Sequence, residues 1–262
     1  MPEVVTEDAT LHVEVDGSGL PVTVVAHGLT NSCRELAAFT PFLDGTAVRF
    51  DFRGHGRSSV PEPGAYRFVD FARDLGAVAD AYGATRAIGT SLGAGAITNL
   101  VAREPGRFEK LVFLLPAALD VRLADHSGYD RIAELLETLD RDEAIETILA
   151  EGGRAAAYER APWLRELDLL LWQDMNPVGV ARAIREVVRD VALPDRAALR
   201  AVSVPTLIIA REGDAIHPVE LARVLADLMP NAELILLGGE QELLAAIPSL
   251  VQRTRDFLAR PA

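Results

Sequence analysis

Short runs of apolar, often β-branched residues alternate along this chain with longer segments of helical periodicity, and this alternation constrains the fold most strongly. The apolar runs lie at residues 11–15, 22–26, 47–50, 86–89, 110–115, 205–210 and 232–237. Helical spacing of apolar residues marks 68–82, 91–103, 219–229 and 243–258. Continuous apolar runs are typical of parallel strands that are buried on both faces. We therefore predict an α/β fold with a mostly parallel central sheet flanked by helices.

The middle of the chain interrupts this alternation. Between residues 119 and 196 the apolar residues recur at helical spacing and no run resembles a strand. We therefore predict one α/β core, built from residues 1–118 and 197–262. A helical cap, or lid, formed by residues 119–196 is inserted between two of its strands.

Charge and cysteine content exclude several classes of protein. The formal net charge of -13 argues against binding to nucleic acid or to an anionic membrane. Cys33 is the single cysteine, so an intrachain disulfide and a metal site of several cysteines are both excluded. The first ten residues are acidic and lack an apolar signal segment, and no stretch approaches the ~18 apolar residues that span a bilayer. We expect a cytoplasmic protein.

One five-residue segment carries the clearest chemical signal. Gly89-Thr90-Ser91-Leu92-Gly93 matches the pattern G-x-S-x-G, with a predicted strand before it and a predicted helix after it. In that setting a serine lies on a sharp turn with its hydroxyl exposed, and the flanking glycines allow strand and helix to approach. The helix N-terminus also directs backbone N–H groups at an anion. Ser91 is our candidate nucleophile, although a plain glycine-rich turn gives the same pattern.

Two further segments accompany this turn. A predicted central strand ends in His27-Gly28-Leu29, and the next predicted strand leads into Asp51-Phe52-Arg53-Gly54-His55-Gly56-Arg57-Ser58. The Ser91 turn follows these two segments, and the Gly213-Asp214 step comes later in the chain. Together, in this order, the four segments resemble the α/β-hydrolase fold superfamily, in its serine esterase and lactonase branch. The resemblance covers nearly the whole chain, but the inserted helices match it in position and size alone.

The resemblance implies roles for several residues. The N–H groups of Leu29 and Leu92 would form an oxyanion hole, and Asp214 would be the acid that orients the base. Asp120, after the strand at 110–115, is the second candidate for the acid. His27 and His55 are expected to be structural, and Asp51 and Arg53 are expected to pair and brace their turn.

The chain departs from the family pattern at the general base. The family's histidine follows the last strand, about seven residues before a proline, and here Gln241 occupies that position ahead of Pro248. A glutamine amide does not titrate near neutrality, and a serine hydroxyl is a weak nucleophile without a base. No histidine occurs after His217.

Four explanations of this departure stay open. In the first, Gln241 is an introduced substitution. In the second, another histidine reaches Ser91. The histidine candidates are His217, in an Asp-x-Ile-His-Pro turn for which we favour a structural role, and His126 in the inserted helices. A third explanation makes Glu240 or Glu242 the base, which requires burial to raise the carboxyl pKa. In the fourth, the protein binds a ligand without hydrolysing it.

The sequence thus favours a serine hydrolase that acts on a carboxylic ester, a lactone or a related acyl substrate, impaired or with a non-standard base. The alternatives are a ligand-binding pseudoenzyme and a lyase-like enzyme without a cofactor. The inserted helices would supply a pocket for a hydrophobic acyl group, and their large side chains are Trp163, Trp172, Met175, Tyr129 and Tyr158. We find no phosphate-binding or metal-binding motif and expect no cofactor and no metal. The sequence leaves a homodimer open.

Overall fold

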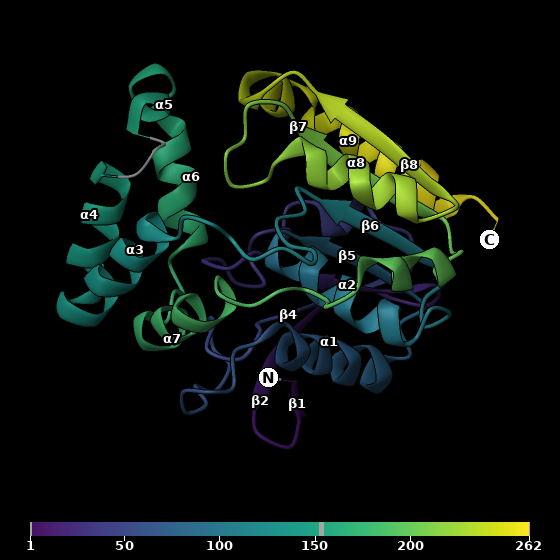
Figure 1. Cartoon of the computed structure of the whole chain (residues 1–262), viewed down its shortest axis with the longest axis horizontal. Coiled ribbons are helices and arrows are strands. Elements are labelled where there is room, and N and C mark those ends of the chain that lie inside the picture. The colour runs from purple at the N-terminus through teal and green to yellow at the C-terminus, as the bar shows by residue number, and fades with distance from the viewer. Residues whose placement is uncertain (1, 152–154, 262) are drawn as a thin grey trace.

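A single eight-stranded sheet forms the centre of the part of the chain that our computed structural model describes, residues 2–151 and 155–261 (Figure 1). Its order is β1-β2-β4-β3-β5-β6-β7-β8. The first two strands are antiparallel to their neighbours, and all pairs from β4 to β8 are parallel. The strands are β1 (Glu3–Val5), β2 (Thr10–Gly17), β3 (Val22–Ala26), β4 (Thr46–Phe50), β5 (Arg86–Thr90), β6 (Lys110–Leu114), β7 (Thr206–Arg211) and β8 (Ala232–Leu237). The predicted mostly parallel α/β fold is confirmed.

Helices cover both faces of this sheet because successive side chains of a strand point to opposite faces. In β3, Val24 and Ala26 pack in the cluster that contains α1 (Phe68–Tyr82), α2 (Leu92–Arg103) and α8 (Val219–Leu228). Val25, between them, packs in the other cluster with the end of α9 (Glu240–Ala259). The central strands are therefore apolar on both faces, as the continuous runs in the sequence predicted.

The segment between β6 and β7 is helical. It contains α3 (Ser127–Thr138), α4 (Arg141–Glu151), α5 (Ala155–Arg160), α6 (Trp163–Leu171) and α7 (Pro177–Val187), and a short 3-10 helix (Arg196–Ala201) leads into β7. Figure 1 shows α3 to α6 as a group beside the sheet. Helices α3, α4 and α7 share a separate buried cluster that includes Leu136, Ile145 and Ile184. The inserted segment thus has a small core of its own.

Close contacts attach the inserted segment to the core loops that follow β3 and β4. A Cβ atom added to Gly179 of α7 would lie 2.0 Å from the carbonyl oxygen of Gly54, so helix and turn can approach this closely only because position 179 has no side chain. Before α7, the Asp174 carboxylate pairs with Arg34 at 2.5 Å and with Arg57 at 3.5 Å. Both arginines belong to core loops that follow β3 and β4.

The single lysine of the chain anchors the C-terminal helix. Lys110 is 2% exposed, and its Nζ donates to the carbonyl oxygens of Phe257 and Leu258, at 3.0 Å each, and of Arg260. A cation at a helix C-terminus satisfies carbonyl groups that have no partner within the helix. No helix of the described part has the length and apolar character to cross a membrane.

Candidate active site

Ser91 lies on the turn between β5 and α2 in a strained backbone conformation. Its φ of 50° and ψ of -105° are unusual for a residue other than glycine, and such a conformation typically costs about 1–3 kcal/mol. Backbone hydrogen bonds hold the turn. The Ser91 N–H donates to the carbonyl oxygen of Leu114 in β6, and the Gly93 N–H donates to the carbonyl oxygen of His27, just after β3. The geometry matches the turn that the G-x-S-x-G pattern predicts.

The two glycines of the motif are required by close backbone contacts. A Cβ atom on Gly89 would lie 2.5 Å from the carbonyl carbon of Gly93, and one on Gly93 would lie 2.4 Å from the carbonyl oxygen of Ala26. Cβ atoms do not approach other atoms this closely, so a larger residue at either position would push α2 away from the sheet. The Ser91 hydroxyl is therefore carried by a rigid part of the fold.

His217 is the histidine that approaches Ser91. Its Nε2 lies 3.1 Å from Ser91 Oγ, and its Nδ1 lies 3.0 Å from Asp214 Oδ2. An acceptor at Nδ1 holds the imidazole in the tautomer that leaves a lone pair on Nε2, the nitrogen that faces the hydroxyl. The structure thus brings the side chains of Ser91, His217 and Asp214 together in one hydrogen-bonded row.

Asp214 also builds the turn that carries His217. Its Oδ1 accepts hydrogen bonds from the backbone N–H groups of Ile216, at 3.0 Å, and of His217, at 3.2 Å. Arg211, at the end of β7, places its Nη2 2.7 Å from Asp214 Oδ2. Burial opposes ionisation of the Asp214 carboxyl, but the hydrogen bond and charge of His217 and the charge of Arg211 outweigh it and hold the pKa of Asp214 at about 2.

The backbone N–H groups expected to form the oxyanion hole belong to Leu29 and Leu92. Leu92 begins α2, so its N–H has no acceptor within the helix, and Leu29 lies in the loop after β3. Among the loop and turn hydrogen bonds of the described residues, neither N–H donates to a backbone carbonyl. The Gly93–His27 hydrogen bond holds the two segments together.

His27 and His55 are buried and bonded in ways that suit the structural role expected for them. His27 Nδ1 donates to the Gly28 carbonyl at 2.7 Å, and its Nε2 accepts from the Phe52 N–H at 3.0 Å, so no lone pair remains for a base. Burial and the neighbouring His55 hold the pKa of His27 well below its usual value. The ring nitrogens of His55 face the carbonyl oxygens of Arg53, at 2.9 Å, and Leu29, at 2.5 Å, which ties the loop of Leu29 to the next turn.

The expected pair of Asp51 with Arg53 is wrong. Arg53 is fully buried and pairs with Asp74 at 2.7 Å and with Asp8 at 2.8 Å. Asp51 instead accepts hydrogen bonds from the backbone N–H groups of Cys33, at 2.7 Å, and Arg57, at 2.9 Å. Both residues brace the turn, but with other partners. The Asp51 carboxylate is taken up by backbone N–H groups of the loops, and the Arg53 guanidinium by the carboxylates of Asp8 and Asp74.

The region around Gln241 explains why no base comes from there. Only Gly238 and Gly239 separate β8 from α9, so residue 241 lies in the first turn of the helix and is exposed. Glu242 points back along the chain and accepts the Gly238 N–H at 2.7 Å. Of the side chains described, the one within hydrogen-bond distance of Ser91 Oγ is that of His217, not Gln241, Glu240 or Glu242.

The other candidates lie with different partners. His126 Nδ1 lies 2.8 Å from Asp130, which also pairs with Arg185 and Arg189 among the inserted helices. Asp120, the second candidate for the acid, pairs with Arg196 at 2.5 Å.

Cys33 is buried, and burial together with the charge of Asp51 raises the pKa of its thiol. A thiol with a raised pKa is a poor nucleophile.

The large side chains of the inserted helices divide between core and surface. Met175 is buried, and Trp172 and Tyr158 pack against the same cluster. Trp163 is 51% exposed on α6. Tyr129 of α3 packs against both the sheet core and the inserted cluster, and burial together with the charge of Asp214 raises the pKa of its phenol. Tyr129 is therefore the member of this set that joins the inserted helices to the sheet core.

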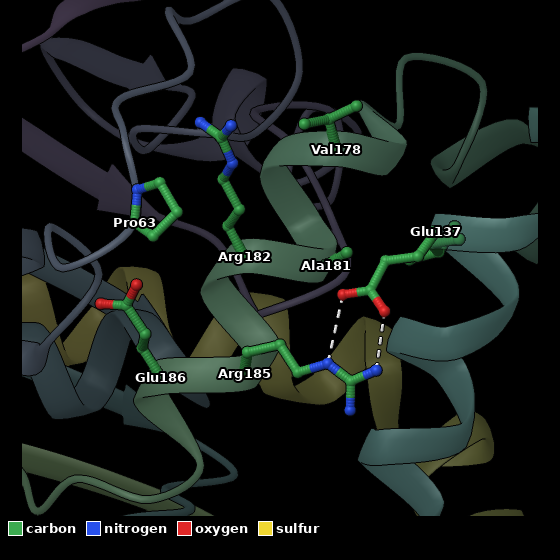
Figure 2. A pocket seen from close by; sticks show the side chains of 8 residues that line it. Pro63, Glu137, Val178, Ala181, Arg182, Arg185 and Glu186 are labelled. Atoms are coloured by element: carbon green, nitrogen blue, oxygen red, sulfur yellow. Dashed lines mark hydrogen bonds and ion pairs between the residues drawn. The ribbon is translucent and has the colours of Figure 1, made fainter.

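A surface pocket of about 460 Å³ lies elsewhere, between α3 and α7 (Figure 2). Its charged side chains already have partners. Arg185 pairs with Glu137, Arg182 donates to the Pro61 carbonyl, and Glu186 accepts from the N–H groups of Gly64 and Tyr66. None of the residues of the Ser91 site lines it, so we assign no chemistry to this pocket.

One group of described side chains has the spacing of metal ligands. His12, Glu14 and Cys33 each place a ligand atom within 4.8 Å of the others. Glu14, however, already pairs with Arg49 at 3.0 Å and with Arg57 at 2.8 Å. A divalent cation would have to displace these guanidinium groups or lie beside them, so the charges around this group oppose a metal.

Glu35, which was not predicted from the sequence, braces the loop of Leu29. Its Oε2 accepts the Gly28 N–H at 2.7 Å, and its Oε1 accepts Asn31 Nδ2 at 2.7 Å. Burial raises the pKa of Glu35 to about 7, although these hydrogen bonds lower it. An acidic residue eight positions after His27 is the signal in the sequence, but its meaning depends on the loop folding back on itself.

Glu35 makes stability depend on pH. Because its pKa is higher in the folded chain, the folded state binds this proton more tightly and the free energy of unfolding falls as pH rises from about 4.5 to about 7. Glu35→Gln changes the free energy of unfolding at each pH. We expect this change to be more stabilising at pH 8 than at pH 4.5 by about 1–2 kcal/mol. Asn31 Oδ1 is buried and has no partner among the described residues. If the Asn31 amide turns over, this oxygen can accept a hydrogen bond from the NH₂ group of the new glutamine.

Urea unfolding at pH 4.5 and pH 8 measures this difference. Glu104→Gln, at an exposed position, serves as the control. An equal effect of Glu35→Gln at both pH values would contradict the assignment.

Comparisons with known proteins agree with this architecture. A family model described as alpha/beta hydrolase fold matches residues 21–244. The AB hydrolase superfamily protein YisY of Bacillus subtilis is 29% identical, over 87% of this chain and 87% of that protein. The crystal structure of a hydrolase from Pseudomonas aeruginosa PA01 superposes with a TM-score of 0.81 at 27% identity, over 99% of this chain and 98% of that chain. The enol-lactonase from Burkholderia xenovorans LB400 gives a TM-score of 0.80 at 21% identity, over 99% of this chain and 100% of that chain. The chain therefore belongs to the α/β-hydrolase fold family.

Proposed function

We propose that this protein is a serine hydrolase of carboxylic esters, lactones or related acyl compounds, with Ser91 as nucleophile, His217 as general base and Asp214 as the orienting acid. The observation that carries the proposal is the placement of His217, with Nε2 3.1 Å from Ser91 Oγ and Nδ1 3.0 Å from Asp214 Oδ2. In this arrangement the acid and the base belong to one turn after β7. Gln241 then needs no catalytic part.

The reaction follows from these positions. Ser91 Oγ attacks the acyl carbon while its proton passes to His217 Nε2, and the carbonyl oxygen becomes an oxyanion held by the N–H groups of Leu29 and Leu92. His217 then gives the proton to the leaving oxygen, and the acyl group stays on Ser91. Water attacks the acyl-enzyme with His217 again as base, which releases the acid and restores the serine.

We infer that the inserted helices, residues 119–196, act as a cap over this site. Support comes from Tyr129, which packs against both the sheet core and the inserted cluster. The pKa of its phenol is raised by burial and by the charge of Asp214. The apolar character of this segment favours a hydrophobic acyl group as substrate. A protein of Mesorhizobium japonicum named as a 2-(acetamidomethylene)succinate hydrolase is 26% identical over 88% of this chain and 84% of that protein, so a hydrolase is found among the relatives.

The competing function is ligand binding without hydrolysis, for which the missing histidine near Pro248 was the argument. An alkyl fluorophosphonate separates the two, since it bonds covalently to a serine that a base has activated. We expect the purified protein to take up one phosphonyl group, located on Ser91 by peptide mass spectrometry, and Ser91→Ala to take up none. Ser249→Ala, on the exposed side of α9, is the control. Equal labelling of Ser91→Ala and the wild type would reject Ser91 as nucleophile.

A further inference from the structure

Arg211 lies beside the acid of the Ser91 site but has no part in the mechanism above. It is the last residue of β7, in register with Leu237 of β8, so its backbone is fixed by the sheet. Its Nη2 lies 2.7 Å from Asp214 Oδ2, the same oxygen that faces His217 Nδ1 at 3.0 Å. Among the described residues, Asp214 is the ion-pair partner that the structure gives to Arg211.

Both side chains of this ion pair are largely buried, which strengthens the interaction between their charges. The side chains of Asp214 and Arg211 are 5% and 19% exposed. Charges in such surroundings are screened much less than charges on the surface. The neighbouring Glu212 is instead directed outward, where it pairs with Arg223 at 3.0 Å and both side chains are about half exposed. The turn after β7 is therefore flanked by two ion pairs: the buried pair of Arg211 with Asp214 and the exposed pair of Arg223 with Glu212.

We propose that Arg211 is a positioning residue that fixes the Asp214 carboxylate and offsets part of its charge beside the His217 ring, so that His217 is able to accept the Ser91 proton. This inference rests on the proposed function. A carboxylate next to an imidazole favours the protonated imidazolium, which cannot act as a base. A guanidinium on the same carboxylate oxygen opposes that effect and still leaves the oxygen as the acceptor for Nδ1–H.

The charged and titratable groups around this pair support the assignment. Asp214 is faced by Arg211 from β7 and by His217 from its own turn. From α3, Tyr129 is close enough for burial and the Asp214 charge to raise the pKa of its phenol. His217 is faced by Asp214 and by the Ser91 hydroxyl. Of these groups, Arg211 is the fixed positive charge.

The test is the pH dependence of Ser91 labelling by an alkyl fluorophosphonate, which needs no knowledge of the substrate. Arg211→Gln removes the charge, and we expect the acid limb of the labelling rate to move to higher pH by about one unit. Arg211→Lys keeps a positive charge and should leave the limb close to that of the wild type. Arg223→Gln is the matched control, because it removes the same charge from the exposed pair at Glu212.

Each outcome bears on one claim. A limb that moves in Arg211→Gln but not in Arg223→Gln supports the proposal, and a limb that stays in place in Arg211→Gln overturns it, even if the rate falls at every pH. If Arg211→Gln does not fold, Arg211→Met provides the same comparison with a longer apolar stem. Labelling of His217→Gln at the wild-type rate would instead reject the proposed function itself.

Discussion

His217→Gln is expected to lower the rate of ester hydrolysis by a factor of about 10⁵–10⁶, close to the loss that removal of the base of a serine hydrolase causes. Glutamine is similar in size and polar, but it cannot accept the proton of Ser91 at neutral pH. Hydrolysis of a short-chain p-nitrophenyl ester, followed as kcat and KM, measures the loss. We expect the loss in kcat rather than in KM, because Nε2 faces the nucleophile and acts in the reacting step.

Two control variants make this result specific. His126→Gln changes the same residue type in the inserted helices, where His126 pairs with Asp130, and should retain the wild-type rate within about twofold. Gln241→His places a histidine where the family has one, but residue 241 lies exposed in the first turn of α9. It should neither raise the wild-type rate nor rescue His217→Gln. Rescue would show that the base belongs on α9.

Asp214 provides the second large effect, because this carboxylate both orients the base and builds its turn. Asp214→Ala removes the acceptor of the His217 ring and of two backbone N–H groups, so we expect a rate lower by about 10³–10⁴ and a loss of about 1–2 kcal/mol in stability. Asp214→Asn keeps an oxygen for the backbone groups, yet its NH₂ group faces Nδ1 and favours the wrong tautomer. It should lose a similar rate and little stability.

Kinetics and urea unfolding of the same two variants separate these roles. Asp120→Asn, at the second candidate for the acid, is the control. Asp120 pairs with Arg196, so its substitution should leave the rate within about twofold of the wild type. A loss in Asp120→Asn as large as that in Asp214→Asn would move the acid to Asp120.

Much of this fold could be predicted because its determinants are local. The β-branched run at Val22–Ala26 and the helical spacing at Phe68–Tyr82 coincide with β3 and α1. Strand β1 (Glu3–Val5) was missed, since three exposed or half-buried residues give no periodic signal and pair through the backbone of β2. The partners of Arg53 were also beyond prediction, because Asp8 and Asp74 lie far from it in sequence.

The site was partly predictable for a similar reason. The strained turn at Ser91 and the Gly213-Asp214 step are short patterns whose geometry follows from the residues themselves. The base that we propose was harder to predict. A histidine position before Pro248 serves Ser91 only if a loop carries it there, and here two glycines lead directly into α9. The Asp-Ala-Ile-His spacing held the alternative, since an aspartate that accepts the N–H groups two and three residues later folds its own turn back on itself.

The most direct test is a crystal structure of the protein with Ser91 labelled by an alkyl phosphonate. We expect His217 Nε2 within ~3 Å of the serine-derived oxygen, with the phosphonyl oxygen between the N–H groups of Leu29 and Leu92 and the Asp214 carboxylate still hydrogen-bonded to Nδ1. An adduct in which His217 points away and another side chain contacts that oxygen would contradict it.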